Sequence, residues 1–170
     1  MQIRLQELGQ MPAHRARFDY TIDLSKEEVG FEFPFRQPVR LEGEVSDEAG
    51  AVTLSAVIHA PVSTRCARCG RPVEYEQETD VDLLLVKELE NDEEELRDDL
   101  FLVESDNVEL DDILIPELIM DMPMSVLCRE DCKGLCIRCG RDLNDGPCGC
   151  VTREIDPRLA VLQKLLDNKE

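Results

Sequence analysis

Cysteine spacing is the feature that most constrains how this chain of 170 residues can fold. Six of its eight cysteines lie in one stretch from Cys128 to Cys150, which reads CREDCKGLCIRCGRDLNDGPCGC. The other two, Cys66 and Cys69, belong to an upstream CARCG motif, and the pattern Cys-x-x-Cys-Gly recurs at residues 136–140. Two thiolates three residues apart can hold one ion from a tight turn, and the glycine that follows can adopt the positive φ that such a turn often needs. Paired motifs of this kind with further cysteines nearby predict metal binding.

The number of cysteines indicates the kind of metal site. Eight thiolates suit two tetrahedral sites of four sulfurs each, a ligand set that zinc prefers. Because four sulfurs leave no position open for water, the two zinc ions are expected to be structural. Iron–sulfur ligation and a disulfide framework are the alternatives. The predicted metal ligands are Cys66, Cys69, Cys128, Cys132, Cys136, Cys139, Cys148 and Cys150.

Two pairings of these cysteines are open. In a nested arrangement, the upstream pair joins Cys128 and Cys132, and the last four cysteines close a local site. In a ribbon arrangement, the two Cys-x-x-Cys-Gly turns share one ion and the other four cysteines share the second. The nested arrangement is favoured because its local site closes a short loop at small entropic cost, and the sequence Asn-Asp-Gly-Pro before Cys148 predicts a returning turn.

Basic residues gather around the cysteines. Each four-sulfur site carries a charge of about −2, and the simpler interpretation is that nearby cations and backbone N–H groups offset it. The alternative is a small patch that contacts phosphate or nucleic acid. The candidates are Arg65, Arg68, Arg71, Arg129, Lys133, Arg138 and Arg141.

The overall charge limits the choice of partner, and the absence of long apolar segments limits the choice of compartment. Aspartate and glutamate number 38 against 19 basic residues, for a formal charge of −19. Phosphate backbones repel such a chain, so broad coating of RNA or DNA is not expected. A basic protein partner, or a small local nucleic-acid contact, is compatible with this charge. The N-terminus lacks the continuous apolar segment of a signal peptide, and no aliphatic run is long enough to span a bilayer. We therefore expect a cytoplasmic protein with no membrane partner, whose reduced cysteines bind metal rather than form disulfides.

Residues 1–170 are expected to form a single domain of the α+β class, with an antiparallel β-sheet or partly open barrel, a packed helix and a C-terminal cysteine-rich zinc module. Alternating apolar and polar residues predict the strands. These strands are Arg17–Leu24, Val39–Val45, Val52–Val62 and Pro72–Val86, with a hairpin loop at Ser46–Gly50. The expected segments are a β-rich part at 1–87, an acidic loop at 88–100, a strand and helix at 101–127, the zinc module at 128–150 and a C-terminal helix at 151–170.

Helices are predicted at three places in the chain. Ser25 with the acids that follow it predicts a short helix, and Asp156 with Pro157 predicts the start of the C-terminal one. A third helix should be capped by Asp111 or Asp112 and end before Pro123, with Pro116 near its first turn. Its predicted buried stripe is Ile115, Leu118, Ile119 and Met122. The acidic run Glu88–Asp99 is expected to be a solvated loop, or else a docking surface for a basic protein.

The stretch Leu127–Cys150 closely resembles the bacterial YceD family, through Cys-Lys-Gly-Leu-Cys-x-x-Cys-Gly-x-x-Leu-Asn and the closing Cys-x-Cys. Residues Arg65–Cys69 and Asp156–Ala160 also fit, so the resemblance spans the whole chain and is most specific in the last third. The family is associated with accumulation of large-subunit ribosomal RNA, and its gene commonly lies beside that of a small zinc-binding ribosomal protein. Some members keep the first cysteine pair without the full C-terminal cluster, which favours the nested pairing.

The resemblance implies a non-enzymatic zinc-binding factor in ribosome biogenesis. Such a factor supports accumulation of large-subunit ribosomal RNA by binding a ribosomal protein or a precursor of that RNA, and it has no small-molecule substrate. The residues themselves predict no nucleophile–base pair, no phosphate-binding glycine loop and no open metal site. The alternatives are a redox-responsive zinc switch, in which oxidation releases zinc, and a generic protein-interaction module.

Overall fold

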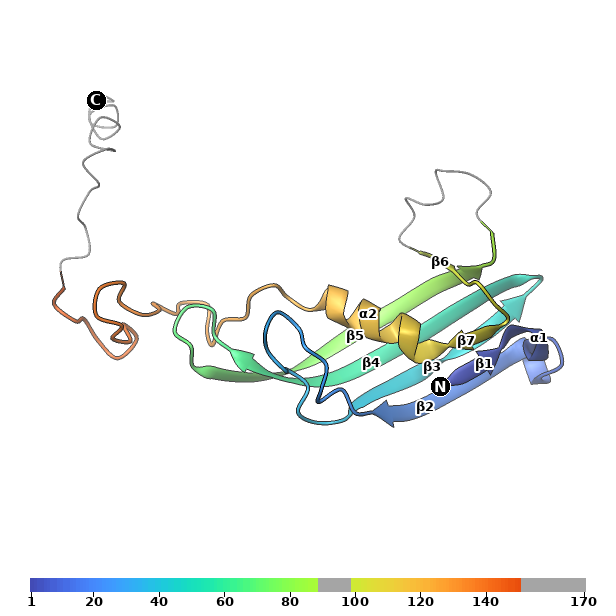
Figure 1. The fold of residues 1–170 in the computed structure, drawn as a ribbon, viewed down its shortest axis with the longest axis horizontal. Helices are drawn as coiled ribbons and strands as arrows, with labels where there is room; N and C mark the ends of the chain where they lie inside the picture. Colours follow the sequence, from blue (N-terminus) through green and yellow to red (C-terminus); the bar gives the residue numbers. More distant parts are fainter. Residues whose placement is uncertain (89–98, 151–170) are drawn as a thin grey trace, which may run out of the picture. The chain divides into compact units, whose positions relative to one another are not determined.

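The computed structural model describes residues 1–88 and 99–150 (Figure 1). They form two compact units: the first contains the described residues of Met1–Thr64 and Pro72–Val126, and the second contains Arg65–Arg71 and the described residues from Leu127 onward. The predicted C-terminal helix and most of the predicted acidic loop lie outside the described residues. The second unit thus combines the predicted zinc module with the upstream CARCG turn, which the sequence prediction assigned to the β-rich part.

A five-stranded sheet forms most of the first unit, in the order β2-β3-β4-β5-β6. Its strands are β2 (Arg15–Ile22), β3 (Val39–Glu48), β4 (Ala51–Arg65), β5 (Pro72–Val86) and β6 (Leu100–Leu102). Strands β2, β3 and β4 pair antiparallel in sequence order, whereas β6 runs parallel to β5. The edge strands β2 and β6 do not pair with each other, so the sheet is open and the barrel alternative is wrong.

The sheet has one apolar and one polar face because successive side chains of a strand point to opposite sides. In β3, Val39, Leu41 and Val45 are buried, whereas Arg40 between them is exposed. The predicted alternation is therefore confirmed, and the mostly β-sheet structure with few helices is consistent with the α+β class.

The β3–β4 hairpin is tighter than predicted. Pairing continues to Glu48 opposite Ala51, so only Ala49 and Gly50 form the turn, both with positive φ (56° and 92°). Two-residue turns with positive φ match the twist of the flanking strands. The wrong boundary arose because Ser46 and the acids after it look like loop residues, although the Ser46 hydroxyl lies 2.8 Å from that of Thr53 across the strands.

Helix α2 (Leu110–Asp121) lies across the apolar face of the sheet (Figure 1). It buries Leu110, Ile113, Leu114 and Leu118 in the same core as the strands. Of the predicted stripe only Leu118 is buried, because apolar residues surround this helix and their spacing does not select one face. Its end before Pro123 is confirmed.

The start of α2 differs from the prediction. The helix begins after Glu109, with no side-chain cap, so Pro116 lies inside the helix and not in its first turn. Asp111 does not cap the helix because its carboxylate accepts hydrogen bonds from the Tyr20 hydroxyl (2.5 Å) and from the Met1 amino group (2.8 Å). Hydrogen bonds to residues distant in sequence therefore take the place of the expected capping hydrogen bond.

Short elements complete the first unit. Strands β1 (Gln2–Arg4) and β7 (Asn107–Glu109) pair antiparallel, and α1 (Leu5–Leu8) and a 3-10 turn (Pro12–His14) precede β2. No helix forms at Ser25, because the Asp23 carboxylate accepts the Ser25 N–H in a local turn (2.9 Å), and residues 23–38 form a loop. None of the helices among the described residues has the length and apolar character needed to span a membrane.

Candidate metal centres

The upstream Cys-x-x-Cys-Gly motif forms a closed turn. The Gly70 N–H donates to the Cys66 carbonyl (2.9 Å), and the Cys66 N–H donates to the Arg71 carbonyl (2.8 Å). Gly70 has a φ of +71°, a conformation that residues with a Cβ rarely adopt. The turn folds the backbone back on itself and leaves the sulfurs of Cys66 and Cys69 close together.

The downstream motif repeats this geometry. The Gly140 N–H donates to the Cys136 carbonyl (2.8 Å), the Cys136 N–H donates to the Arg141 carbonyl (2.8 Å), and the φ of Gly140 is again +71°. Equal sequence spacing has therefore produced equal backbone turns. Each turn presents two sulfurs and needs two more to complete a tetrahedral site.

Two sulfurs from elsewhere complete the first cluster. The Sγ atoms of Cys66, Cys69, Cys128 and Cys132 all lie within 4.8 Å of one another. Two of the separations are 3.8 Å (Cys66 to Cys132) and 3.6 Å (Cys69 to Cys128). A tetrahedron with zinc–sulfur bonds of about 2.3 Å has edges of about 3.8 Å, whereas a disulfide bond is about 2.05 Å long. The spacing of the sulfurs fits a shared ion.

The second cluster is local in sequence. Its Sγ atoms, from Cys136, Cys139, Cys148 and Cys150, also lie within 4.8 Å of one another, and all eight cysteines are free thiols. The structure therefore groups the sulfurs as in the nested arrangement. The ribbon arrangement is wrong for this structure, because it would place the sulfurs of both Cys-x-x-Cys-Gly turns in one cluster.

The thiols within each cluster differ in acidity. Hydrogen bonds from backbone N–H groups, first that of Cys128, lower the pKa of Cys66 to about 6. Backbone N–H groups of Cys139 and Arg138 likewise lower the pKa of Cys136 to about 6. Removal from water and the neighbouring thiols raise the pKa of Cys128 to about 12. A hydrogen bond from Asn144 also lowers the pKa of Cys132. Each cluster thus contains thiols whose lowered pKa favours the thiolate, which is the form that binds metal.

Cysteines occupy the interior of the second unit. Among its described residues, the only buried ones are Cys66, Cys69, Cys132, Gly134 and Cys136. Leu127 and Leu143 are only partly buried, and Leu135 and Ile137 are exposed, Ile137 to 86%. A segment without an aliphatic core needs cross-links to fold, and metal binding can supply that free energy. The donor set and the burial pattern both fit one metal ion in each cluster.

Asn144 supports the first cluster from outside. Its side-chain amide donates to the Cys132 sulfur (3.4 Å). Its Oδ1 atom accepts hydrogen bonds from the Arg129 guanidinium (2.7 Å) and from the Lys133 N–H (2.8 Å). Groups in this position orient metal ligands. The sequence prediction assigned Asn144 only to a turn and missed this contact.

Two arginines connect the upstream turn to the downstream segment. The Arg68 guanidinium donates to the Cys132 carbonyl (2.9 Å), and the Arg68 carbonyl accepts the Leu135 N–H (3.2 Å). Arg71 pairs with the carboxylates of Asp142 (2.8 Å) and Asp145 (2.6 Å). These contacts hold the first cluster together across a separation of about sixty residues in the chain.

The predicted basic patch is largely engaged in internal contacts. Arg68, Arg71 and Arg129 bond carbonyl, carboxylate or amide oxygens of the same unit. Within the part of the chain that the structure describes, Lys133 and Arg141 are the members whose side chains make no hydrogen bond or ion pair. This distribution favours the charge-balance interpretation over a continuous phosphate-binding patch.

Comparison with known proteins identifies the family. The family model described as Large ribosomal RNA subunit accumulation protein YceD matches residues 54–166. The uncharacterised protein YlbN of Bacillus subtilis is 28% identical over 98% of this chain and 96% of its own length. An uncharacterised protein of Mycobacterium tuberculosis is 31% identical over 74% of this chain, which spans 61% of that relative.

A plant protein shares the family name. The Large ribosomal RNA subunit accumulation protein YCED homolog 1, chloroplastic, of Arabidopsis thaliana is 24% identical over 82% of this chain, which spans 52% of that relative. No solved structure matches the chain. The family model covers both cysteine clusters and about two thirds of the residues, and the chain belongs to the YceD family.

Proposed function

We propose that this chain is a non-enzymatic, zinc-binding factor of cytoplasmic ribosome biogenesis, which supports accumulation of large-subunit ribosomal RNA. The family name carries the ribosomal part of the proposal. The observation that carries the chemical part is the pair of four-sulfur clusters in a unit whose buried residues are almost all cysteines. Each cluster is proposed to hold one structural zinc ion.

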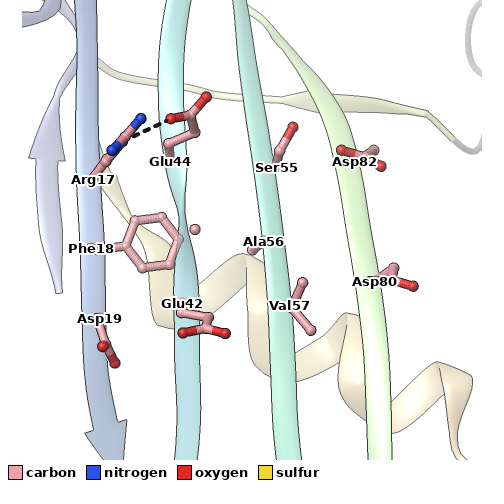
Figure 2. Close-up of a pocket in the computed structure, with 11 residues that line it drawn as sticks. Arg17, Phe18, Asp19, Glu42, Glu44, Ser55, Ala56, Val57, Asp80 and Asp82 are labelled. Atoms are coloured by element: carbon pink, nitrogen blue, oxygen red, sulfur yellow. Dashed lines mark hydrogen bonds and ion pairs between the residues drawn. The ribbon is translucent and has the colours of Figure 1, made fainter.

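The distribution of charge favours a basic ribosomal protein as the direct partner over precursor ribosomal RNA. The polar face of the sheet, opposite α2, has a shallow hollow lined by five carboxylates and one arginine, Arg17 (Figure 2). Arg17 pairs with Glu44 (3.2 Å), and Arg40 pairs with Asp19 (2.9 Å) and Glu42 (2.6 Å). Asp80 and Asp82 make no ion pair among the described residues. Phosphate groups would be repelled from this face, and lysine or arginine side chains would be attracted to it.

The metal assignment is tested by elemental analysis of purified full-length protein. We expect two zinc atoms per chain, and one after replacement of Cys148 and Cys150 by serine. A visible absorbance with bound iron would contradict the zinc assignment. Purified protein that is folded but contains no metal, or that has disulfides among the eight cysteines, would contradict metal binding altogether.

The ribosomal role is tested in cells that lack the gene. We expect reduced large-subunit ribosomal RNA relative to small-subunit RNA, and tagged protein in particles that precede the mature large subunit. Crosslinking to RNA alone would favour the RNA alternative. Normal subunit ratios together with absence from those particles would overturn the proposal.

A redox-responsive zinc switch is the second candidate. The observation in its favour is that Cys139 is exposed, so oxidants can reach a sulfur of the second cluster. This candidate predicts zinc release at low peroxide concentrations and its reversal by thiols. Release only at concentrations that also oxidise the methionines would rule it out.

A further inference from the structure

A tight turn in the loop after β2 carries an aromatic residue into solvent. Val29 and Glu32 exchange backbone hydrogen bonds, with N···O distances of 2.8 Å and 3.1 Å, and Gly30 and Phe31 form the turn between them. The side chain of Phe31 is 96% exposed. Its backbone φ is +72°. This residue therefore combines full exposure of a large apolar side chain with an unfavourable backbone conformation.

The backbone conformation makes the phenylalanine unexpected at this position. Positive φ is uncommon outside glycine, and it is a marked outlier for bulky residues. Glycine or asparagine would satisfy the same turn at lower cost. Strained residues persist where the surrounding structure holds them, and they cluster at functional sites. The contribution of Phe31 to folding does not account for its presence, because its side chain packs against almost nothing.

The surrounding loop is anchored rather than loosely attached. Leu24 and Phe35, on either side of the turn, are buried in the core, and Phe35 forms a β-bridge with Val62. The Thr64 hydroxyl donates to the Glu32 carboxylate (2.8 Å). These contacts hold the turn in place, so binding through Phe31 would cost little additional ordering of the backbone.

The other aromatic residues strengthen the argument. The chain has seven aromatic residues, all among the described residues. Of these, only Phe31 and Phe33 are exposed, and the exposed fraction of Phe33 is 52%. Both lie on this loop, two positions apart. Exposed aromatic side chains in a supported position are typical anchors of protein–protein interfaces.

The charge around the turn indicates the chemistry of the partner. Acidic residues outnumber basic ones between positions 23 and 36 by four to two. The acids are Asp23, Glu27, Glu28 and Glu32, and the bases are Lys26 and Arg36. Aromatic residues that stack on nucleic acid bases lie in positively charged grooves, and this loop has the opposite charge.

We propose that the turn Val29–Glu32 is a docking site for a basic protein, with Phe31 inserted into an apolar pocket and Phe33 beside it. The loop carboxylates then pair with lysine or arginine side chains at the rim of that pocket. The identification of this partner with a large-subunit ribosomal protein rests on the function proposed above. The docking site itself rests only on the exposure, conformation and charge of the loop.

Site-specific crosslinking tests where the partner binds. The photoreactive residue benzoylphenylalanine replaces Phe31 in full-length protein in cells, with replacement of the half-buried Phe101 as the control. We expect crosslinks from position 31, and not from position 101, to a peptide of one protein that is rich in lysine and arginine. Crosslinks to RNA, to a second copy of this chain or to nothing would each overturn the proposal.

Variants separate docking from folding. Phe31→Gly removes the anchor and also relieves the positive φ, so we expect binding to the crosslinked protein to weaken roughly tenfold or more, while Tm stays unchanged or rises. Met120→Ala removes another exposed side chain, on α2 (81% exposed), and should leave binding unchanged. A fall in Tm with Phe31→Gly, or equal weakening by both variants, would overturn the proposal.

The two proposals can fail separately. If the crosslinked protein is basic but not ribosomal, and the gene deletion leaves ribosomal RNA unchanged, the docking site stands and the ribosomal role fails. If deletion lowers large-subunit RNA while Phe31→Gly restores it as well as the unaltered gene does, the ribosomal role stands and the docking site fails.

Discussion

Replacement of Gly134 by alanine would test how the upstream turn is held in the first cluster. Gly134 has a φ of +72°, and a Cβ added there would lie 3.0 Å from the Arg68 carbonyl oxygen. That oxygen accepts the Leu135 N–H (3.2 Å). The left-handed conformation costs an alanine about 1–2 kcal/mol, and displacement of the carbonyl would cost about 1 kcal/mol more through the weakened hydrogen bond.

Gly70→Ala is the matched control in the same cluster. Gly70 has nearly the same φ (+71°), but no atom lies within 4 Å of the added Cβ. The strain therefore cancels between the two variants, and the difference isolates the contact with Arg68. We expect Gly134→Ala to weaken the first cluster by about 1 kcal/mol more than Gly70→Ala, which is roughly fivefold in an equilibrium constant.

Alkylation resolved by residue provides the assay. Protein is incubated with a zinc chelator and iodoacetamide, and mass spectrometry reports modification of Cys66 and Cys69 separately from Cys148 and Cys150. The upstream pair should become reactive at lower chelator concentration in Gly134→Ala than in Gly70→Ala. Equal sensitivity of the two variants, or a larger effect on the downstream pair, would refute the reasoning.

Three further predictions address other parts of the chain. Burial and the hydrogen bond to Asp111 raise the pKa of Tyr20, and burial raises that of Tyr75, so absorbance near 295 nm should show less phenolate in folded than in unfolded protein at about pH 10, where a free tyrosine is half ionised. Because the folded protein favours the protonated phenol, the contribution of Tyr20 to the free energy of unfolding is present below about pH 10 and is lost above it. Tyr20→Phe should therefore reduce the loss of stability at alkaline pH. An unchanged pH dependence of stability would contradict the raised pKa of Tyr20. Asn144→Ala removes the donor to the Cys132 sulfur and should speed zinc loss from the first cluster by about tenfold or more, measured with a chromogenic chelator, whereas equal rates would deny it a supporting role. Pro116 is exposed inside α2, so Pro116→Ala should raise the free energy of unfolding by about 1–2 kcal/mol, measured by denaturant titration; a decrease would show that the proline is not strained there.

Local patterns predicted the parts of the structure that depend on neighbours in sequence. The alternation in β3 and β4 predicted strands because one face of each strand is buried. The two Cys-x-x-Cys-Gly motifs predicted turns because four residues and a glycine suffice to form each turn. The nested grouping of the sulfurs could be favoured from loop length, since Cys136 and Cys150 are close in sequence.

Contacts between distant residues account for most of what was missed. Asp111 looked like a helix cap, but Tyr20 and Met1 occupy its carboxylate. The parallel pairing of β6 with β5 follows from the path of the chain and not from the composition of residues 100–102. Asn144 looked like a turn residue, and only the folded structure places its amide beside the Cys132 sulfur.

The loop that carries Phe31 illustrates a further limit of sequence patterns. Phe31 and Phe33 alternate with a polar residue as in a half-buried strand, yet both are exposed, because Gly30 and Phe31 adopt positive φ and reverse the chain. A phenylalanine in that conformation contradicts local preference. Such contradictions are expected at functional positions.

The near absence of aliphatic side chains inside the second unit makes its folding depend on the supply of metal in the cell. A segment whose interior consists of cysteine thiols, and not of aliphatic side chains, stays folded only while the metal ion is bound. On the zinc assignment, a cell starved of zinc would first lose the folded cysteine-rich part of this protein, while the β-sheet, with its ordinary apolar core, would remain folded. On the ribosomal role proposed above, accumulation of large-subunit ribosomal RNA would then fall as zinc becomes scarce.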